Sequence, residues 1–392
     1  MSMGRLQRLL PVLLLVAGLL GGCVTLPRAS FSAAEQAAAS PPRFEHVRYR
    51  QDDPALAEML AATLRPNARG AVNVLAISGG GANGAFGAGL LYGWGRTGGR
   101  PQFQLVTGVS AGALAAPFAF LGPEWNERLR QSYAGSGVHH LLKARGLMIL
   151  LTPGLFHKAP LSDLVHAYVT DDLLRAVAVE QAKGRRLLVA TTNLDTEELI
   201  VWDMGAIAAH GGPEARELFA QVLTASATVP GVFAPTMIEV EAGGRRFAEM
   251  HVDGQTDSAF FAIPLAWFLG SGAPDAHDDH HLFILVNGRL DGEFAVTPRA
   301  TIPIIKRTVD TVTKASLRTA ILSTLEFCRR NGCGLSVAAM PSSETDDPMD
   351  FGAAHIQRLF AAGQAAGEGG RAWKLATPAL SGAGAPGASA GH

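Results

Sequence analysis

The sequence has few cysteines and almost no net charge. It contains 3 cysteines in 392 residues, too few for a fold held together by disulfides. Lys and Arg number 33 against 34 Asp and Glu, a formal net charge of -1, so the chain lacks the excess of positive charge that draws proteins to nucleic acid. We therefore expect no nucleic-acid partner. With 48% hydrophobic residues and 45 glycines, the composition is typical of a compact globular protein with a large core.

The sequence also lacks uninterrupted apolar runs of membrane-spanning length beyond its N-terminus. Arginines precede the apolar run 9–20, which has about the length of a signal-peptide core and is short for a bilayer span. The run ends in Leu20-Gly21-Gly22-Cys23, which resembles the lipobox of bacterial lipoproteins. We expect residues 1–22 to be removed as a signal peptide and Cys23 to carry the lipid. The alternative is an ordinary signal with a chance cysteine.

The two ends of the mature chain differ in composition from its middle. Residues 24–42 are rich in Ala, Ser and Pro, which predicts a lipidated tether over 23–45. Residues 376–392 are Gly, Ala, Ser and Pro with almost no charge, which predicts a disordered tail. Between them we expect one folded domain over 46–375. Val24 after the lipobox cysteine, in place of the Asp that often retains lipoproteins at the inner membrane, predicts an outer-membrane protein facing the periplasm.

Apolar segments alternate with helical patterns along the middle of the chain. Short apolar runs predict strands at 72–77, 103–106, 186–191, 199–202 and 281–286. Helical patterns occupy 82–94, 111–121, 161–182 and 304–329, and 238–252 is typical of a hairpin with Gly243-Gly244 at its turn. This alternation predicts an α/β fold with a mostly parallel central sheet and helices on both faces.

A serine between two glycines provides the first candidate for chemistry. Gly108-Val109-Ser110-Ala111-Gly112 follows a predicted strand and begins an Ala-rich helix. This is the context of a nucleophile elbow, in which flanking glycines relieve crowding and the serine hydroxyl projects from a tight turn. The motif alone is common by chance in a glycine-rich chain, so the prediction that Ser110 is a nucleophile depends on this context.

A glycine cluster directly follows the first predicted strand. In Ser78-Gly79-Gly80-Gly81-Ala82-Asn83-Gly84, successive backbone N–H groups can turn toward one anion at the N-terminus of a helix. The spacing also satisfies G-x-G-x-x-G, but the acidic residue that a dinucleotide fold places about twenty positions later is missing. No Gly-Lys-Ser/Thr follows, which excludes a P-loop. We expect an oxyanion hole formed by Gly79, Gly80, Gly81, Ala82 and Ala111.

Two further motifs complete a recognisable series. Residues 224–235 read TASATVPGVFAP, and Asp253-Gly254-Gln255 follows the predicted hairpin. The glycine-rich loop, G-x-S-x-G, the segment Ala225-Ser226-Ala227-Thr228-Val229-Pro230 with a following F-x-P, and D-G in this order resemble the patatin-like phospholipases over about 72–255, and 350–368 is similar to the C-terminal end of that family. The sequence departs from the family pattern at Asn83, where Arg or Lys is usual, and at Gln255, where Gly or Ala is usual.

The resemblance implies a Ser-Asp dyad on a patatin-like α/β fold. Ser110 is then the nucleophile and Asp253 its base, with no histidine and no metal or other cofactor. The chemistry is consistent, because a carboxylate can take the serine proton if burial raises its pKa toward neutrality. The resemblance further implies hydrolysis of fatty acyl esters of phospholipids or lysophospholipids by a membrane-tethered enzyme. Two alternatives stay open, a lipid-binding or scaffold protein of the same fold and an acyltransferase.

Several other residues and segments have more than one interpretation from the sequence. His251 lies two residues before Asp253, so a strand would place both on one face, and a Ser-His arrangement is the alternative to the dyad. Residues 277–281 (HDDHH) suggest a metal site, although a polar loop before a strand explains them better. Cys328 and Cys333 form either a disulfide or two free thiols. The apolar segment 141–156 is either a lid or a core helix.

Overall fold

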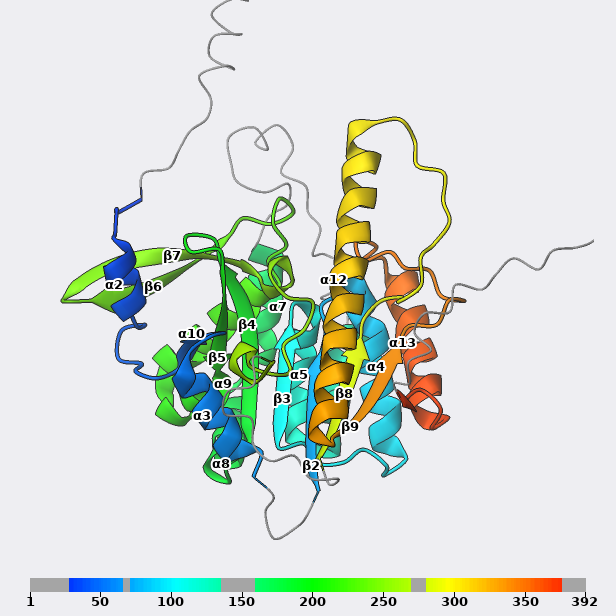
Figure 1. Cartoon of the computed structure of the whole chain (residues 1–392), viewed down its shortest axis with the longest axis horizontal. Helices are drawn as coiled ribbons and strands as arrows, with labels where there is room; N and C mark the ends of the chain where they lie inside the picture. Colours follow the sequence, from blue (N-terminus) through cyan, green and yellow to red (C-terminus); the bar gives the residue numbers. More distant parts are fainter. Residues whose placement is uncertain (1–27, 66–70, 135–158, 269–279, 376–392) are drawn as a thin grey trace, which may run out of the picture.

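The computed structural model describes residues 28–65, 71–134, 159–268 and 280–375 (Figure 1). Five parallel strands form the centre of one sheet, in the order β4-β3-β2-β8-β9. They are β2 (Val72–Ile77), β3 (Leu105–Val109), β4 (Arg186–Asn193), β8 (His280–Val286) and β9 (Gly334–Ala339). Most of their side chains are buried, as expected for parallel strands covered on both faces. The α/β fold with a mostly parallel central sheet is therefore confirmed.

Antiparallel strands extend this sheet at its margins. They are β1 (Arg48–Arg50), β5 (Glu198–Asp203), β10 (Lys374–Leu375) and the hairpin of β6 (Thr236–Ala242) and β7 (Arg245–Asp253). The expected strand at 199–202 is β5, but it runs antiparallel to β4 because only four residues connect the two strands. Strand β7 also pairs antiparallel with the end of β4, which brings the hairpin to the carboxyl edge of the parallel strands.

Helices cover both faces of the sheet and enclose two hydrophobic clusters. The larger cluster lies beneath α4 (Gly84–Arg96), α5 (Ala111–Leu121), α6 (Asn126–Ala134), α7 (Ala159–Tyr168), α8 (Asp171–Ala182), α9 (Met204–His210), α10 (Gly212–Ser226) and α13 (Ala353–Glu368). The smaller cluster lies beneath α3 (Pro54–Thr63), α11 (Leu265–Phe268) and α12 (Thr301–Asn331). Glycines let α4 and α13 approach closely, since a Cβ on Gly363 would lie 1.9 Å from the carbonyl oxygen of Phe86.

The expected single helix over 161–182 is wrong, because two helices, α7 and α8, occupy this region. Thr170 has an extended backbone, and its hydroxyl accepts a hydrogen bond from the N–H of Leu173 at 3.2 Å, so it caps α8. Asp171 and Asp172 follow in the first turn, where negative charge is favourable. The capping signal Thr-Asp-Asp therefore outweighs the continuous helical pattern.

The described part of the expected tether packs on the domain. From Arg28 onward the chain forms α2 (Ala33–Ala38) and an antiparallel bridge between Ser40 and Glu241. The Arg28 guanidinium binds both carboxylate oxygens of Asp195, at 2.7 and 2.8 Å. The linker-like composition of residues 28–45 thus belongs to a docked segment, which polar contacts, the stacking of Phe31 on Phe247 and the burial of Phe44 hold on the domain.

Cys328 and Cys333 form a disulfide at the end of α12, with a Cα–Cα distance of 4.6 Å. Gly332 between them adopts a left-handed conformation (φ 74°) that ends the helix. Within the four described ranges, none of the helices combines the length and the apolar character that crossing a bilayer requires.

Candidate active site

Strand β4 positions the two predicted catalytic residues, Ser110 and Asp253, at the carboxyl edge of the parallel strands. Val109, the last residue of β3, pairs with Ala190 of β4, and Asp253, the last residue of β7, pairs with the next residue, Thr191. Ser110 follows Val109 directly. The hydrogen-bond registers of two adjacent strand pairs therefore bring Ser110 and Asp253 together although 143 residues separate them in sequence.

Ser110 and Asp253 are in direct contact. The Ser110 hydroxyl donates a hydrogen bond of 2.5 Å to Oδ2 of Asp253, and both residues are buried. Burial raises the pKa of Asp253 to about 7, against the hydrogen bonds from Ser110 and from the N–H of Gln255, which lower it. A carboxylate with a pKa near neutrality can accept the proton of a serine hydroxyl and later return it.

The turn that carries Ser110 has the geometry of a nucleophile elbow. Ser110 has φ 56° and ψ -126°, a conformation that non-glycine residues rarely adopt. A Cβ on Gly112 would lie 2.4 Å from the carbonyl oxygen of Ile77, so only glycine lets the turn approach β2 this closely. The same requirement holds at Gly108, where a Cβ would lie 2.7 Å from the Cα of Ala113.

Ser226 supports this turn, a contribution that the sequence predictions missed. Its hydroxyl accepts a hydrogen bond from the N–H of Ser110 at 3.0 Å and donates one to the carbonyl of Ala190 at 2.7 Å. Ser226 therefore links the elbow to β4, the strand that also aligns Asp253. The segment 224–235 contained this residue, but its motif did not show which atoms it would contact.

The backbone around the elbow offers three N–H groups to an anion. Within the described ranges, no hydrogen-bond acceptor is recorded for the N–H groups of Gly80, Gly81 and Ala111. Gly80 and Gly81 have positive φ values of 159° and 54°, and Ala111 begins α5. These groups can stabilise negative charge on an oxygen, and the N-terminus of α5 contributes its partial positive charge.

Two members of the expected oxyanion hole use their N–H groups elsewhere. The N–H of Ala82 donates to the carbonyl of Pro348 at 2.9 Å, and that of Gly79 donates to the carbonyl of Ala259 at 3.4 Å. Both acceptors come from loops distant in sequence, which explains why the glycine-rich pattern alone could not reveal them. Gly79 and Ala82 shape the turn, and they are removed from the set of candidate donors.

Gln255 and Asn83, the two departures from the family pattern, have defined positions. A Cβ on Gly79 would lie 2.1 Å from Oε1 of Gln255, so the absence of a side chain at Gly79 leaves room for this carboxamide beside the elbow. Asn83 is buried and donates a 2.7 Å hydrogen bond to Asp346, which forms a 2.8 Å ion pair with Lys314 of α12. Asn83 therefore connects the glycine-rich turn to α12.

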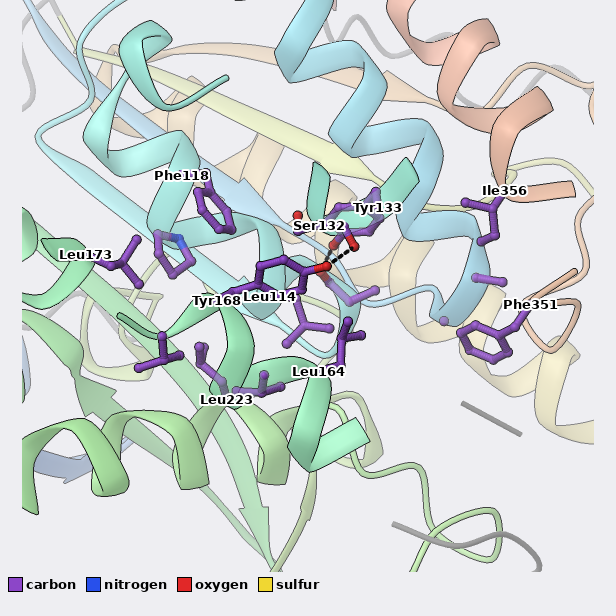
Figure 2. Close-up of a pocket in the computed structure, with 16 residues that line it drawn as sticks. Leu114, Phe118, Ser132, Tyr133, Leu164, Tyr168, Leu173, Leu223, Phe351 and Ile356 are labelled. Carbon is purple, nitrogen blue, oxygen red and sulfur yellow. Dashed lines mark hydrogen bonds between the residues drawn. The ribbon is translucent and has the colours of Figure 1, made fainter. Parts of the chain in front are cut away.

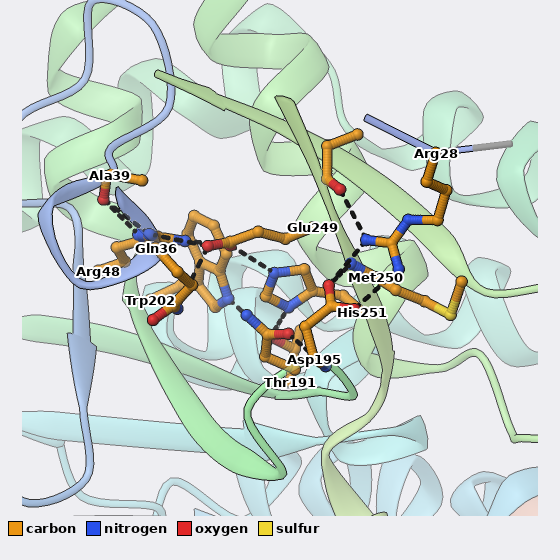
Figure 3. Close-up of polar contacts among 12 residues, drawn as sticks. Arg28, Gln36, Ala39, Arg48, Thr191, Asp195, Trp202, Glu249, Met250 and His251 are labelled. Carbon is orange, nitrogen blue, oxygen red and sulfur yellow. Dashed lines mark hydrogen bonds and ion pairs between the residues drawn. The ribbon is translucent and has the colours of Figure 1, made fainter. Parts of the chain in front are cut away.

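His251 is not a partner of Ser110. Figure 3 shows its ring between Thr191 and Glu249 in a fully buried network. Trp202 donates to the Thr191 hydroxyl at 2.8 Å, which leaves this hydroxyl to donate to Nδ1 of His251 at 2.9 Å, and Nε2 then donates to Glu249 at 3.1 Å. Burial lowers the pKa of His251, which agrees with a neutral ring. Both ring nitrogens are occupied, and the serine contacts Asp253 instead.

The same network joins the N-terminal segment to the strand that carries Asp253. Arg48 of β1 forms an ion pair with the buried carboxylate of Glu249 and also donates to the carbonyl of Ala39 (Figure 3). Burial opposes the charge on Glu249, but the hydrogen bonds from His251 and Arg48 outweigh it and lower the pKa of Glu249. Charge and hydrogen bonds therefore hold this region of β7, in addition to the apolar packing of Phe247 and the ring contact between Trp202 and His251.

An apolar pocket opens at the glycine-rich turn. Most of its lining side chains are apolar, as is typical of small-molecule sites. Gly81, Ala82 and Ala111 form one end of it, and Figure 2 shows Leu114 and Phe118 among the side chains along its walls. The other walls come from α6, α7, α8, α10, α13 and the loop residue Phe351, and none of the described lining residues is Asp, Glu, His, Lys or Arg. A group that enters it meets mainly apolar side chains, with Ser132, Tyr133 and Tyr168 as the polar residues of the lining.

The remaining candidate sites contain no catalytic arrangement within the described residues. His280 and His281 begin β8, and their Nε2 atoms bond to the carbonyl of Leu64 and the hydroxyl of Ser336. In the described ranges no three side chains of the metal-binding types form a group. The expected lid or core helix at 141–156 and the lipobox cysteine Cys23 lie outside the described residues.

Residues 75–264 match a family model described as patatin-like phospholipase, a range that contains the elbow, the Ser226 segment and Asp253. The crystal structure of VipD from Legionella pneumophila is similar at 13% sequence identity and a TM-score of 0.33, over 76% of this chain and 66% of that chain. The chain thus spans slightly less than two thirds of the length of that protein. No curated protein matches the chain.

Proposed function

The chain carries a patatin-like phospholipase domain at residues 75–264, and we propose from this premise that it cleaves fatty acyl esters of phospholipids or lysophospholipids with a Ser110-Asp253 dyad. The family supports lipid hydrolysis in general. The observation that carries the finer proposal is the 2.5 Å contact between Ser110 Oγ and Asp253 Oδ2. It joins a serine on an elbow to a buried base whose pKa is close to neutral.

The geometry supports a two-step reaction. The ionised Asp253 takes the proton of Ser110 as Oγ attacks the ester carbonyl, and the resulting oxyanion is bound by the free N–H groups of Gly80, Gly81 and Ala111. The tetrahedral intermediate collapses, the C–O bond to the alcohol breaks, and the departing oxygen receives the proton from Asp253. Water then gives a proton to Asp253 and attacks the acyl-enzyme, which releases a fatty acid and returns the proton to Ser110.

A fluorophosphonate probe tests whether Ser110 is activated. Such a probe reacts with an activated serine hydroxyl and not with an ordinary one, because it needs both a base and an oxyanion hole. We expect one adduct per chain, located on Ser110 by peptide mass spectrometry, with loss of ester hydrolysis in proportion. An unlabelled Ser110 in a folded chain would favour the lipid-binding or scaffold alternative, and products formed with added alcohol or lysolipid distinguish an acyltransferase.

The pocket is proposed to bind the acyl chain of the substrate. Leu114 lies one helical turn after Ala111 and lines the pocket, so Leu114→Trp should fill space on the side of the pocket that Ala111 borders. We expect the variant to lose kcat/KM for long-chain esters about tenfold or more while it retains hydrolysis of acetyl esters, which leave the pocket empty. Leu322→Trp, on the exposed side of α12, is the matched control. An equal loss for short and long chains would contradict the assignment.

We also propose that the protein is exported, lipidated at Cys23 and held at the outer membrane facing the periplasm. Support comes from the charged and apolar pattern of residues 1–22 and from the lipobox sequence. Intact mass spectrometry of the mature protein tests the proposal, since it predicts a chain that starts at Cys23 with added acyl mass. A mature chain that starts elsewhere would contradict it, without affecting the proposed chemistry.

A further inference from the structure

The first half of α12 has no buried residue among those whose side chains are described. Large apolar side chains on it are half or more exposed: Ile304 (50%), Ile305 (53%), Val309 (57%) and Val312 (63%). The second half, from Leu317, packs normally on the sheet through Leu317, Ile321 and Phe327. Figure 1 shows that the first half projects beyond the rest of the helical layers.

On an ordinary surface helix the apolar side chains face the protein and the charged side chains face solvent. On this half of α12 the arrangement is reversed. Lys306, Asp310 and Lys314 follow each other at four-residue spacing, and the two lysines form ion pairs with Asp347 and Asp346 of the loop packed against the helix. The charged face is therefore turned toward the protein. Ile305, Val309 and Val312, at spacings of four and three, form the opposite, solvent-facing stripe.

A loop adds two more exposed apolar side chains next to this helix. Phe294 is 93% exposed and Val296 is 84% exposed, in the segment that connects β8 to α12. Arg307 donates a hydrogen bond to the carbonyl of Glu293, which holds this loop beside the first turns of α12. We call the six residues together the apolar tip: Phe294, Val296, Ile304, Ile305, Val309 and Val312.

The apolar tip lies at the same edge of the sheet as the dyad. The loop begins at Asn287, directly after β8, and the Asn287 side chain donates to the carbonyl of Ser78 at 2.7 Å. A Cβ on Gly80, one of the oxyanion donors, would lie 2.0 Å from the carbonyl oxygen of Asn287. The segment that carries the apolar tip therefore starts in contact with the candidate oxyanion hole.

We propose that the apolar tip docks on a phospholipid surface and presents the dyad to lipids in it. The choice of a lipid surface rests on the proposed function, because a phospholipid substrate lies in a membrane and this edge must face it. Charge supports the same choice. Arg299 and Arg307 flank the tip, and among the described residues neither forms an ion pair. One guanidinium nitrogen of Arg307 is used by the Glu293 carbonyl, so Arg299 and the rest of the Arg307 guanidinium can meet lipid phosphates, with the exposed Asp291 as the opposing charge in the loop. Glu293 in the same loop pairs with Arg289.

The test reports on docking independently of catalysis. The full chain with Val309→Cys, labelled with the environment-sensitive fluorophore NBD, is mixed with vesicles of phosphatidylcholine and phosphatidylglycerol. We expect a blue shift and quenching by lipids that carry a quencher in the acyl region, because the probe enters the interface. Val179→Cys is the matched control. Val179 is 55% exposed on α8, and the chain passes from α8 to the start of β4, at the edge of the sheet opposite to the dyad. The parent chain supplies the labelling background.

A second variant links docking to turnover. Val309→Asp with Val312→Asp should reduce hydrolysis of vesicle phospholipid by about tenfold or more and leave a soluble short-chain ester unaffected, because charges on the apolar stripe oppose insertion. An unchanged Val309 probe on vesicles would overturn the proposal. A blue shift without vesicles that grows with protein concentration would also overturn it, in favour of a second copy on this face. If the parent hydrolyses no ester but the probe still shifts, docking stands and the proposed function fails.

Discussion

Replacement of Ser110 by alanine is expected to reduce ester hydrolysis by about 10⁴-fold or more, because the acyl-enzyme cannot form without the nucleophile. The fold should stay intact. Among the residues that the structure describes, the Ser110 hydroxyl bonds to Asp253 alone, while the hydrogen bond from the backbone N–H of Ser110 to Ser226 holds the elbow. The measurement is kcat/KM on a soluble ester and on phospholipid, with circular dichroism and melting temperature as the record of folding.

Ser336→Ala is the matched control for this variant. Ser336 is a buried serine on β9, hydrogen-bonded to His281 and outside the site. We expect it to keep most of the activity. A Ser110→Ala protein that retained turnover would contradict the nucleophile assignment, whereas a loss caused by both variants together with a lower melting temperature would indicate damage to the fold.

Replacement of Asp253 by asparagine is expected to reduce kcat/KM by about 10³-fold or more, since an amide of the same shape cannot take the serine proton. For the unmodified enzyme, kcat/KM should rise with pH and level off above a pKa of about 7, because only the ionised carboxylate acts as a base. A pH series from acid to weakly alkaline conditions measures both effects. Asp257→Asn, four residues further on and exposed, is the control and should behave as the parent.

The same substitution has a consequence for stability. Burial raises the pKa of Asp253 above its value in the unfolded chain, so the contribution of this group to stability is complete below the unfolded pKa near 4 and is lost as the pH rises through about 7. Asparagine carries no charge at any pH. We therefore expect Asp253→Asn to lose this part of the pH dependence and to be relatively more stable at alkaline pH. A parent and a variant with parallel stability curves would show that Asp253 is not buried in this way.

Sequence patterns predicted those structural features that are determined by residues close together in the chain. The apolar runs identified the parallel strands, and Gly108 and Gly112 identified the turn because their missing side chains are required within the motif itself. Long-range contacts were not predictable in the same way. Gly79 and Ala82 match an anion loop by sequence, but the carbonyls of Ala259 and Pro348, from remote loops, occupy their N–H groups.

Two larger segments show the same limit of sequence patterns. The composition of residues 28–45 indicates a tether, yet polar contacts at Arg28 and Ser40 and the apolar contacts of Phe31 and Phe44 fasten this stretch to the domain. In α12 the helical pattern was evident, but periodicity gives the faces of a helix without saying which face meets the protein. The ion pairs of Lys306 and Lys314 settle that orientation.

The pairing of β4 with both β3 and β7 fixes the backbone positions of Ser110 and Asp253 relative to each other. Because Ala190 and Thr191 are adjacent residues of one strand, the spacing between hydroxyl and carboxylate is built into backbone ladders. Such ladders leave little freedom for the two groups to separate and rejoin during a catalytic cycle. The two groups are thus in contact before substrate binds. We expect the rate of turnover in a cell to depend on the supply of lipid rather than on a conformational change that assembles the dyad.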